Sequence, residues 1–196
     1  MRLFVALDIP DAIRHAIAAY VDELRRVAPD AKWVRAESFH ITLKFIGEWR
    51  RDVSEVIEAL KKVEALPVDL AIRGSGFFPN PHSSRVFWVG IEADRTLAAL
   101  ARRVDEACAA LGMERESREF SPHLTLARSG SGSPRPRKDE KAVPSMKRLA
   151  ERMADLPAPD FGTIHATEFF LYESKLSPSG AQYKKLKSFA LVDGSR

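Results

Sequence analysis

The sequence of 196 residues contains a single cysteine, Cys108. One cysteine excludes an intramolecular disulfide framework and a zinc site built from several thiolates. Cys108 lies in a helical stretch rich in Ala and Leu, and we interpret it as a small apolar core residue. A chain without disulfides fits a reducing compartment, so we expect a cytoplasmic protein.

The sequence also lacks any apolar run of about 18 residues, so no membrane-spanning helix is expected. The first ten residues, MRLFVALDIP, are apolar over a short stretch but lack a long hydrophobic region and a small-residue cleavage site. We interpret them as a first strand and not as a signal peptide. Nothing in the sequence requires a membrane or more than a monomer.

Charge is only mildly unbalanced, because 31 Lys and Arg residues face 27 Asp and Glu residues, a formal net charge of +4. Such an excess suits an anionic partner such as nucleic acid, although on charge alone an ordinary solvated surface explains it better. Hydrophobic residues make up 45% of the chain, enough for one sizeable core or two small lobes. We therefore expect a single domain spanning residues 1–196.

The spacing of apolar residues predicts a mixture of helices and strands. A period of three to four residues predicts helices at 11–27, 52–65, 94–111 and 145–155. Short β-prone runs predict strands at 2–8, 32–34, 39–46, 68–73, 85–91, 122–128, 163–173 and 183–192. Residues 129–145 are rich in Ser, Gly, Pro and charge, which is typical of an exposed flexible loop. This order favours an α+β fold with antiparallel or mixed sheets.

One four-residue pattern occurs twice, each time inside a predicted strand. The first copy is His-Ile-Thr-Leu at residues 40–43, and the second is His-Leu-Thr-Leu at residues 123–126. The copies are 83 residues apart, close to half the chain. This weak internal repeat suggests two related lobes that each contribute one strand.

The alternation of a strand places residues i and i+2 on one face. His40, Thr42 and Lys44 should therefore share a face, as should His123 and Thr125. The opposite face of each strand should enter the core; it carries Phe39, Ile41, Leu43 and Phe45 in the first copy, and Leu124 and Leu126 in the second. If the two strands meet, two imidazoles and two hydroxyls converge.

Two imidazoles suit the opening of a phosphodiester. With an unperturbed pKa of about 6.5, one histidine can take a proton from water while the other protonates the leaving ribose oxygen. Hydroxyl groups of Thr42 and Thr125 can donate hydrogen bonds to the phosphate oxygens. A single His-x-Thr is more often a polar surface pattern, but two copies in the same apolar phase favour catalysis. A zinc site is disfavoured because no His-Glu-x-x-His or carboxylate set accompanies the histidines.

At these motifs the sequence resembles the 2H phosphoesterase superfamily, and within it the RNA 2′,3′-cyclic phosphodiesterases once called 2′–5′ RNA ligases. The resemblance covers nearly the whole chain. It is carried in order by RLFVALDIP, KWVRAESFHITLKFIGE, GFFPNPHSSRVFWVGI, EFSPHLTLAR and FFLYESKLSPSGAQYKKLKSF.

The resemblance implies a bilobal α+β fold of two pseudo-symmetric sheets, with helices on the outer faces and a central groove. It implies hydrolysis of a terminal 2′,3′-cyclic phosphate to a 2′-phosphate, on RNA or a cyclic nucleotide, without a cofactor or metal. His40 becomes the proton donor, His123 the proton acceptor, and Thr42 and Thr125 bind phosphate. The residues alone leave the two histidine roles interchangeable.

Other side chains are candidates for substrate binding. Arg128 could bring positive charge to the phosphate, although its parity matches Leu124 and Leu126 unless the strand ends or bulges. Lys44 has the expected parity for the same task. Phe45, Phe77 and Tyr183 are candidates for stacking on a base, with core packing as the alternative, which is favoured for Phe45.

Two other functions remain compatible with the sequence. The same imidazoles could run the reverse reaction and form a 2′–5′ linkage, although water should make hydrolysis dominate. The basic residues at 135–141 also fit a module that binds RNA ends without turning them over.

Overall fold

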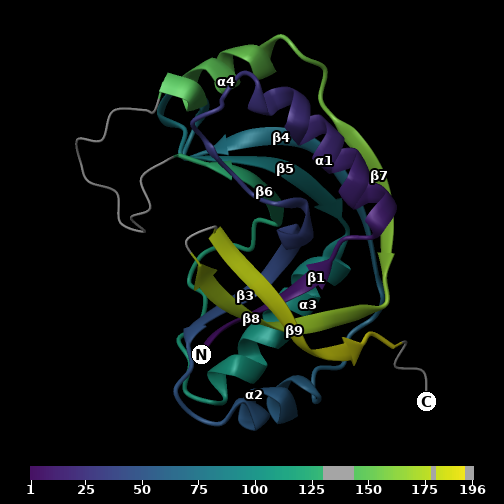
Figure 1. The fold of residues 1–196 in the computed structure, drawn as a ribbon. Helices are drawn as coiled ribbons and strands as arrows, with labels where there is room; N and C mark the ends of the chain where they lie inside the picture. The colour runs from purple at the N-terminus through teal and green to yellow at the C-terminus, as the bar shows by residue number, and fades with distance from the viewer. Residues whose placement is uncertain (130–143, 178–179, 193–196) are drawn as a thin grey trace.

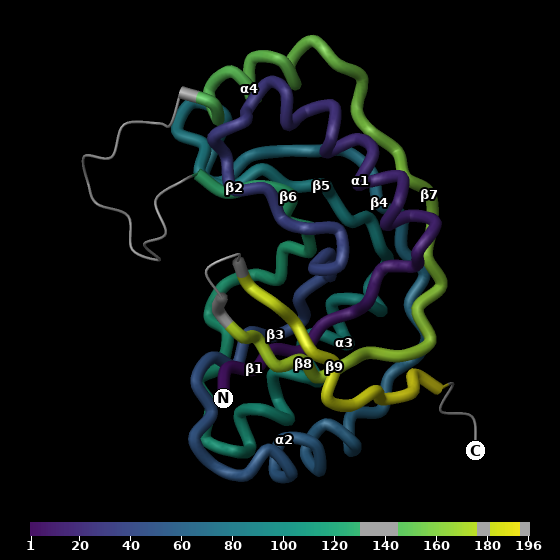
Figure 2. The backbone as a smooth tube through the Cα atoms, in the orientation of Figure 1, coloured from purple at the N-terminus to yellow at the C-terminus, as the bar shows by residue number. Residues whose placement is uncertain are grey.

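The computed structural model describes residues 1–129, 144–177 and 180–192. Its strands form two antiparallel sheets with helices on their outer sides (Figure 1). Figure 2 follows the chain as it crosses repeatedly from one sheet to the other, so neither half of the sequence folds as a separate unit. Among the described residues, no helix combines the length and apolar character needed to cross a membrane.

The first sheet has four strands in the order β3-β1-β8-β9. They are β3 (His40–Glu48), β1 (Arg2–Asp8), β8 (Glu168–Ser177) and β9 (Gly180–Ala190). Strand β3, which carries the first histidine motif, pairs with β1 in a register that sets Asp8 opposite His40.

The second sheet has five strands in the order β2-β6-β5-β4-β7. They are β2 (Lys32–Trp33), β6 (His123–Arg128), β5 (Val86–Ala93), β4 (Val68–Phe78) and β7 (Asp160–Ala166). Strand β6 carries the second motif, and its register with β5 sets Gly90 opposite His123 and Trp88 opposite Thr125.

Four α-helices cover the sheets in the described part of the chain (Figure 1). Helices α1 (Asp11–Arg25) and α4 (Pro144–Ala154) lie over the second sheet, whereas α2 (Val53–Leu60) and α3 (Arg95–Ala109) lie beside the first. Side chains of Asp52 and Asp94 cap α2 and α3 by accepting hydrogen bonds from the backbone amides of Ser54 and Thr96. Such caps satisfy amides that lack a partner inside the helix. Short 3-10 turns, η1 (Ala36–Ser38) and η2 (Pro81–Ser83), precede β3 and β5.

The alternation of each strand divides the side chains between two environments. One continuous apolar core fills the space between the sheets and the helices, and Cys108 is buried in it. A second, smaller cluster covers the opposite face of the first sheet; its members are Phe4, Ala6, Phe170 and Tyr172, with Tyr183 packed against them. This aromatic cluster is separate from the main core, and His40 packs against its Phe4 ring.

The α+β class and the two antiparallel sheets predicted from the sequence are confirmed. The stretch 163–173, which we expected to be one strand, is divided between β7 and β8, which lie in different sheets. Helix 52–65 ends earlier than predicted, at Leu60. Most of the loop expected at 129–145 lies outside the described residues.

Candidate active site

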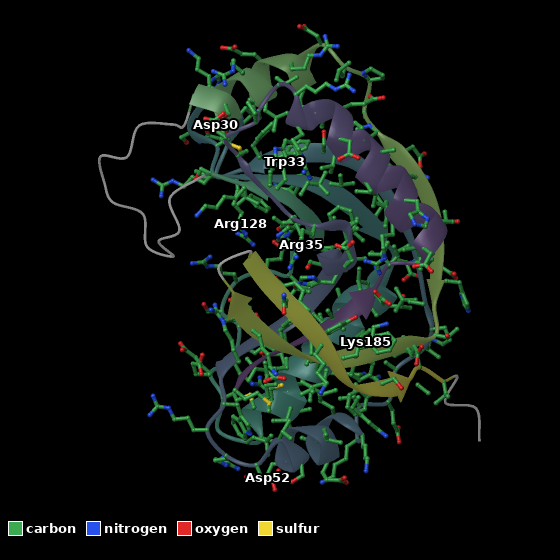
Figure 3. All side chains as sticks on the ribbon, viewed as in Figure 1. Asp30, Trp33, Arg35, Asp52, Arg128 and Lys185 are labelled. Atoms are coloured by element: carbon green, nitrogen blue, oxygen red, sulfur yellow. The ribbon has the colours of Figure 1, made fainter. Side chains whose placement is uncertain are left out.

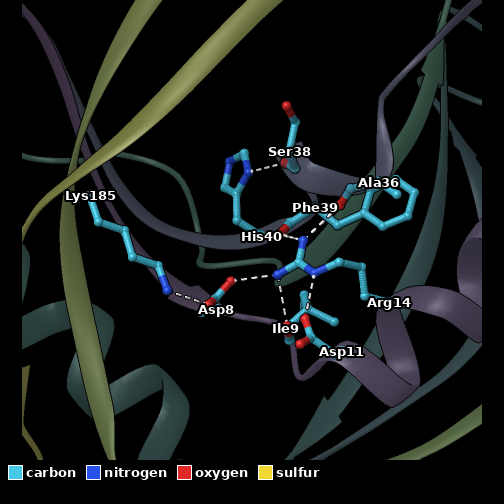
Figure 4. Close-up of polar contacts among 9 residues, drawn as sticks. All are labelled: Asp8, Ile9, Asp11, Arg14, Ala36, Ser38, Phe39, His40 and Lys185. Atoms are coloured by element: carbon cyan, nitrogen blue, oxygen red, sulfur yellow. Dashed lines mark hydrogen bonds and ion pairs between the residues drawn. The ribbon is translucent and has the colours of Figure 1, made fainter.

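His40 stands at the start of β3 on the aromatic cluster of the first sheet. Its ring centroid lies 4.7 Å from that of Phe4 and 5.1 Å from that of Tyr183. Its Nδ1 lies 2.7 Å from the backbone oxygen of Ser38, two residues earlier (Figure 4). A carbonyl oxygen only accepts hydrogen bonds, so Nδ1 carries the hydrogen and Nε2 is left to exchange protons.

His123 repeats this arrangement on the second sheet. Its Nδ1 lies 2.9 Å from the backbone oxygen of Ser121, again two residues earlier. Its ring rests on aromatic side chains, with centroids 5.0 Å from Phe78 and 6.4 Å from Trp88. The two histidines therefore share a tautomer, and each ring is supported by aromatic side chains.

One glycine makes room for the indole that supports His123, and a second lets two strands approach closely beside it. A Cβ atom on Gly76 would lie 2.3 Å from the Trp88 ring, and one on Gly90 would lie 2.6 Å from the backbone oxygen of Arg73. The missing side chain of Gly76 thus leaves space for the indole of Trp88, its partner on the neighbouring strand, and that of Gly90 leaves space for the backbone of Arg73. Its Nε1 atom is buried and finds no hydrogen-bond partner among the described residues.

The two motifs approach each other in space, because several residues of β3 and β6 come within 8 Å between Cα atoms. Burial lowers the pKa of His40 below its usual value, and the positive charges of Arg128 and His123 lower it further. The hydrogen bond to Ser38 and the negative charge of Asp8 act in the opposite direction. His40 on β3 therefore lies close enough to His123 and Arg128 on β6 for their charges to act on its pKa.

A bulge interrupts the alternation of each motif strand at the same position. In β3, Val5 pairs with Lys44 and Ala6 with Thr42, so Leu43 is an extra residue. In β6, Phe87 pairs with Ala127 and Trp88 with Thr125, so Leu126 is an extra residue. Such a bulge turns the side chains that follow it to the opposite face, until Ile46 makes a second bulge in β3. The residue five positions after each histidine is therefore exposed.

The expectation that Lys44 shares a face with His40 and Thr42 is wrong for this reason. Leu43 and Lys44 both point inward, and the Lys44 side chain is only 7% exposed. Its Nζ lies 2.5 Å from Oδ1 of Asp105 on α3 and donates to the backbone oxygen of Glu114 at 2.8 Å. Lys44 is thus held in a part-buried ion pair at the wall of the cavity described below, and its contact with substrate stays a prediction.

The same bulges expose two other candidates. Phe45, expected in the core, is 53% exposed, and the guanidinium of Arg2 lies 5.0 Å from its ring centroid. Because of the bulge at Leu126, Arg128 lies on the same face of β6 as His123. Figure 3 shows Arg128 between the two sheets together with Arg35. Arg35 donates to the backbone oxygen of Ala181 on β9 at 3.5 Å.

A cavity of about 1020 Å³ opens beside this pair of strands. Its lining includes Thr42, Phe45 and His123 together with residues of α3. The apolar part of its lining includes Phe78 and Phe120, and its charged part includes Arg85, Arg102, Arg118, Glu116 and Glu119. The space is of the size that ligand sites occupy, and it is much larger than a phosphate.

Sequence reasoning missed several residues of the site. Phe77, a stacking candidate, is buried in the core, and its neighbour Phe78 faces His123 instead. Phe4 and Asp8 share a face of β1 with Ala6, and their period-two spacing in the first strand was a signal that could have identified them. Tyr183 does lie at the site, with its ring edge against His40.

No metal centre accompanies these residues in the parts of the chain that the structure covers. Among residues 1–129, 144–177 and 180–192, no group of three or more His, Cys, Asp or Glu side chains is arranged to hold a metal ion.

Comparison of the sequence with known proteins identifies relatives of this chain. The sequence model of the family described as LigT like phosphoesterase matches twice, over residues 7–88 and 89–183, and each match contains one histidine motif. An RNA 2′,3′-cyclic phosphodiesterase of Archaeoglobus fulgidus is 34% identical over 190 residues, covering 96% of this chain and 99% of the relative. The RNA 2′,3′-cyclic phosphodiesterase of Escherichia coli K12 is 30% identical over 195 residues, covering 97% of both chains.

Solved structures agree with the sequence comparison. The crystal structure of Escherichia coli LigT in complex with 3′-AMP superposes with a TM-score of 0.75 at 26% identity and covers 98% of both chains. A crystal structure from Thermus thermophilus gives a TM-score of 0.74 at 28% identity, with 97% of this chain and 98% of the other covered. The repeated family match, the relatives and the shared fold place this chain in the family of LigT-like phosphoesterases, within the 2H phosphoesterases.

Proposed function

We propose that the chain hydrolyses RNA 2′,3′-cyclic phosphate ends to 2′-phosphates by acid–base catalysis between His40 and His123, without a metal ion. Cyclic phosphodiesterase activity follows from the family and from the activity in the names of its relatives. The observation that supports the mechanism is the repeated geometry of the two imidazoles. Each has Nδ1 engaged by a backbone oxygen, which leaves Nε2 to exchange a proton.

The reaction needs one proton removed and one delivered. His123 takes a proton from a water molecule as its oxygen forms a bond to phosphorus. The bond from phosphorus to the ribose O3′ breaks, and His40 gives its proton to that oxygen. The product keeps its phosphate on O2′, and the two histidines regain their starting states by exchanging protons with solvent. Each proton transfer of this kind contributes roughly 10²–10⁴-fold to the rate.

Three further side chains bind the phosphate in this proposal. Hydroxyl groups of Thr42 and Thr125, two residues after each histidine, donate to the non-bridging oxygens. Arg128, brought to the same face by the bulge, supplies a positive charge as negative charge develops on those oxygens. Tyr183 and Phe45 offer rings on which a base can stack.

The lowered pKa of His40 bears on its role as donor. Burial, with the positive charge of Arg128, favours the neutral ring in the free enzyme. A bound phosphate adds a negative charge beside the imidazole and raises its pKa, which restores the proton that the reaction needs. Binding of the substrate thus favours the protonated form of His40, which is the form that acts as proton donor.

Single substitutions test the assignment on a 2′,3′-cyclic mononucleotide. We expect His40→Ala and His123→Ala each to lower kcat by roughly 10²-fold or more, with the fold retained. His15→Ala is the matched control, because His15 lies exposed on α1. Assays with a chelator test metal independence, and chromatography of the product distinguishes the 2′-phosphate from the 3′-phosphate. Turnover close to that of the unmodified enzyme in either variant would refute the two-histidine mechanism.

A further inference from the structure

A guanidinium group from α1 lies beside the turn that precedes His40. Arg14 is largely buried, with 14% of its side chain exposed, and makes contacts on both sides of that turn (Figure 4). We propose that Arg14 is a positioning residue for His40, holding the turn whose backbone oxygen fixes the imidazole tautomer. This inference rests on the proposed function, because it concerns the histidine assigned as proton donor.

One arm of the guanidinium holds the turn directly. Nη1 donates to the backbone oxygen of Ala36 at 2.6 Å and to that of Phe39 at 3.4 Å. These two carbonyl groups flank Ser38, whose own oxygen accepts the hydrogen bond from Nδ1 of His40. With its neighbours held on both sides, the Ser38 peptide has little freedom to rotate away from the ring.

The other arm ties Arg14 to the strand that pairs with β3. Nη2 donates to Oδ1 of Asp8 at 2.8 Å and to the backbone oxygen of Ile9 at 2.7 Å. Asp8 lies opposite His40 in the register, and its second carboxylate oxygen accepts from Lys185 on β9. Arg14 therefore links the turn before His40 to the strand beside it, and Asp8 fixes the orientation of the fork.

The planar fork of arginine is necessary for this arrangement. Its two terminal nitrogens point in fixed directions and serve two different sets of acceptors, whereas an ammonium group is a single point of charge. The turn before His123 has no such support, since no guanidinium from the described residues bonds to the backbone of residues 119–123. The support is therefore specific to one of two otherwise similar histidines.

Other charged and titratable groups also face His40, and the test must separate them from Arg14. They are Asp8 on β1, Lys185 and Tyr183 on β9, Tyr172 on β8, and His123 and Arg128 on β6. A lysine at position 14 would keep the positive charge beside Asp8 but lose the fork. A glutamine would lose the charge as well.

The experiment compares Arg14→Lys and Arg14→Gln on a 2′,3′-cyclic mononucleotide, with Arg25→Gln as the control. Arg25 is an exposed arginine in the last turn of the same helix. We expect both Arg14 variants to lose between about tenfold and about 100-fold in kcat with little change in KM, because misplacement by about 1 Å costs that much. Thermal melting verifies that each variant is folded, and the Arg14→Lys variant alone suffices if Arg14→Gln does not fold.

A second readout reports the tautomer without relying on activity. Long-range 1H–15N spectra of the neutral rings should show His40 protonated at Nδ1 in the unmodified protein and a mixture of tautomers in both Arg14 variants, with His123 unchanged. The inference is overturned if Arg14→Lys keeps the kcat and the His40 spectrum of the unmodified protein. A fully active His40→Ala enzyme would instead refute the proposed function, so the two failures are distinguishable.

Discussion

The contact between Gly76 and the Trp88 indole, which supports the ring of His123, predicts how much stability a substitution at Gly76 should cost. In Gly76→Ala, the new methyl group would lie 2.3 Å from the nearest atom of the Trp88 indole, so the ring must retreat by about 1.1 Å to reach an ordinary contact distance of 3.4 Å. Two further indole atoms would lie within 2.9 Å. Overpacking of this kind costs about 1–3 kcal/mol of stability. Because the indole supports the ring of His123, kcat should also fall.

A double-mutant cycle isolates this contact. In a Trp88→Phe background the clashing part of the indole is absent, so Gly76→Ala should cost less than in the unmodified protein by about 1–2 kcal/mol. The free energy of unfolding is measured by urea denaturation, with an unchanged m-value as the check that only stability has changed. The kcat for a cyclic nucleotide is measured alongside. Gly74→Ala is the control: its φ of +73° predicts backbone strain, nothing lies within 4 Å of its Cβ, and its cost should not depend on Trp88. Equal costs of Gly76→Ala in both backgrounds would contradict the reasoning.

Three further outcomes follow from the site. Arg128→Met should raise the pKa of His40, although burial still lowers it most, and should raise the KM by about tenfold; an unchanged NMR titration of His40 would show that the two groups are not coupled. Lys44→Met should destabilise the fold by about 1–3 kcal/mol in urea unfolding, because Asp105 is largely shielded from solvent and keeps only the hydrogen bond from the Glu116 amide. Adding Asp105→Leu should recover much of the loss. The lowered pKa of His40 contributes stability that is complete above about pH 6.5 and is lost as pH falls through the folded-state pKa, so His40→Gln should flatten this part of the stability profile; parallel profiles would contradict the shift.

Strand alternation was sufficient to locate the two motifs but not every side chain around them. It placed His40 and Thr42 on one face and buried Ile41 and Leu43, as the structure has them. It failed at Lys44 because of a bulge. A bulge is an extra residue in the pairing with a neighbouring strand, and the alternation of apolar residues in this strand gave no signal of it. For Arg128 a bulge was the condition for reaching the groove, and that condition is met.

Contacts between distant segments were beyond reach for a different reason. Arg14 and Ala36 are 22 residues apart, and Lys185 reaches Asp8 across most of the chain. Such pairs depend on how β1, α1 and β9 are brought together, which periodicity does not specify. Similarly, the stretch 163–173 is split between two sheets at Thr167, where two successive exposed residues, Thr167 and Glu168, interrupt the alternation; so short an interruption did not predict a change of sheet.

The matching bulges in β3 and β6 expose a different side chain beside each histidine. Two imidazoles related by approximate twofold symmetry would treat O2′ and O3′ of a ribose alike. The fifth residue after each histidine breaks that equivalence, because an aromatic ring stands at one of these positions and a cation at the other. If the proposed roles hold, a nucleotide whose base stacks on Phe45 and whose phosphate binds Arg128 would enter in one of the two orientations, and that orientation would select which ester bond is cut.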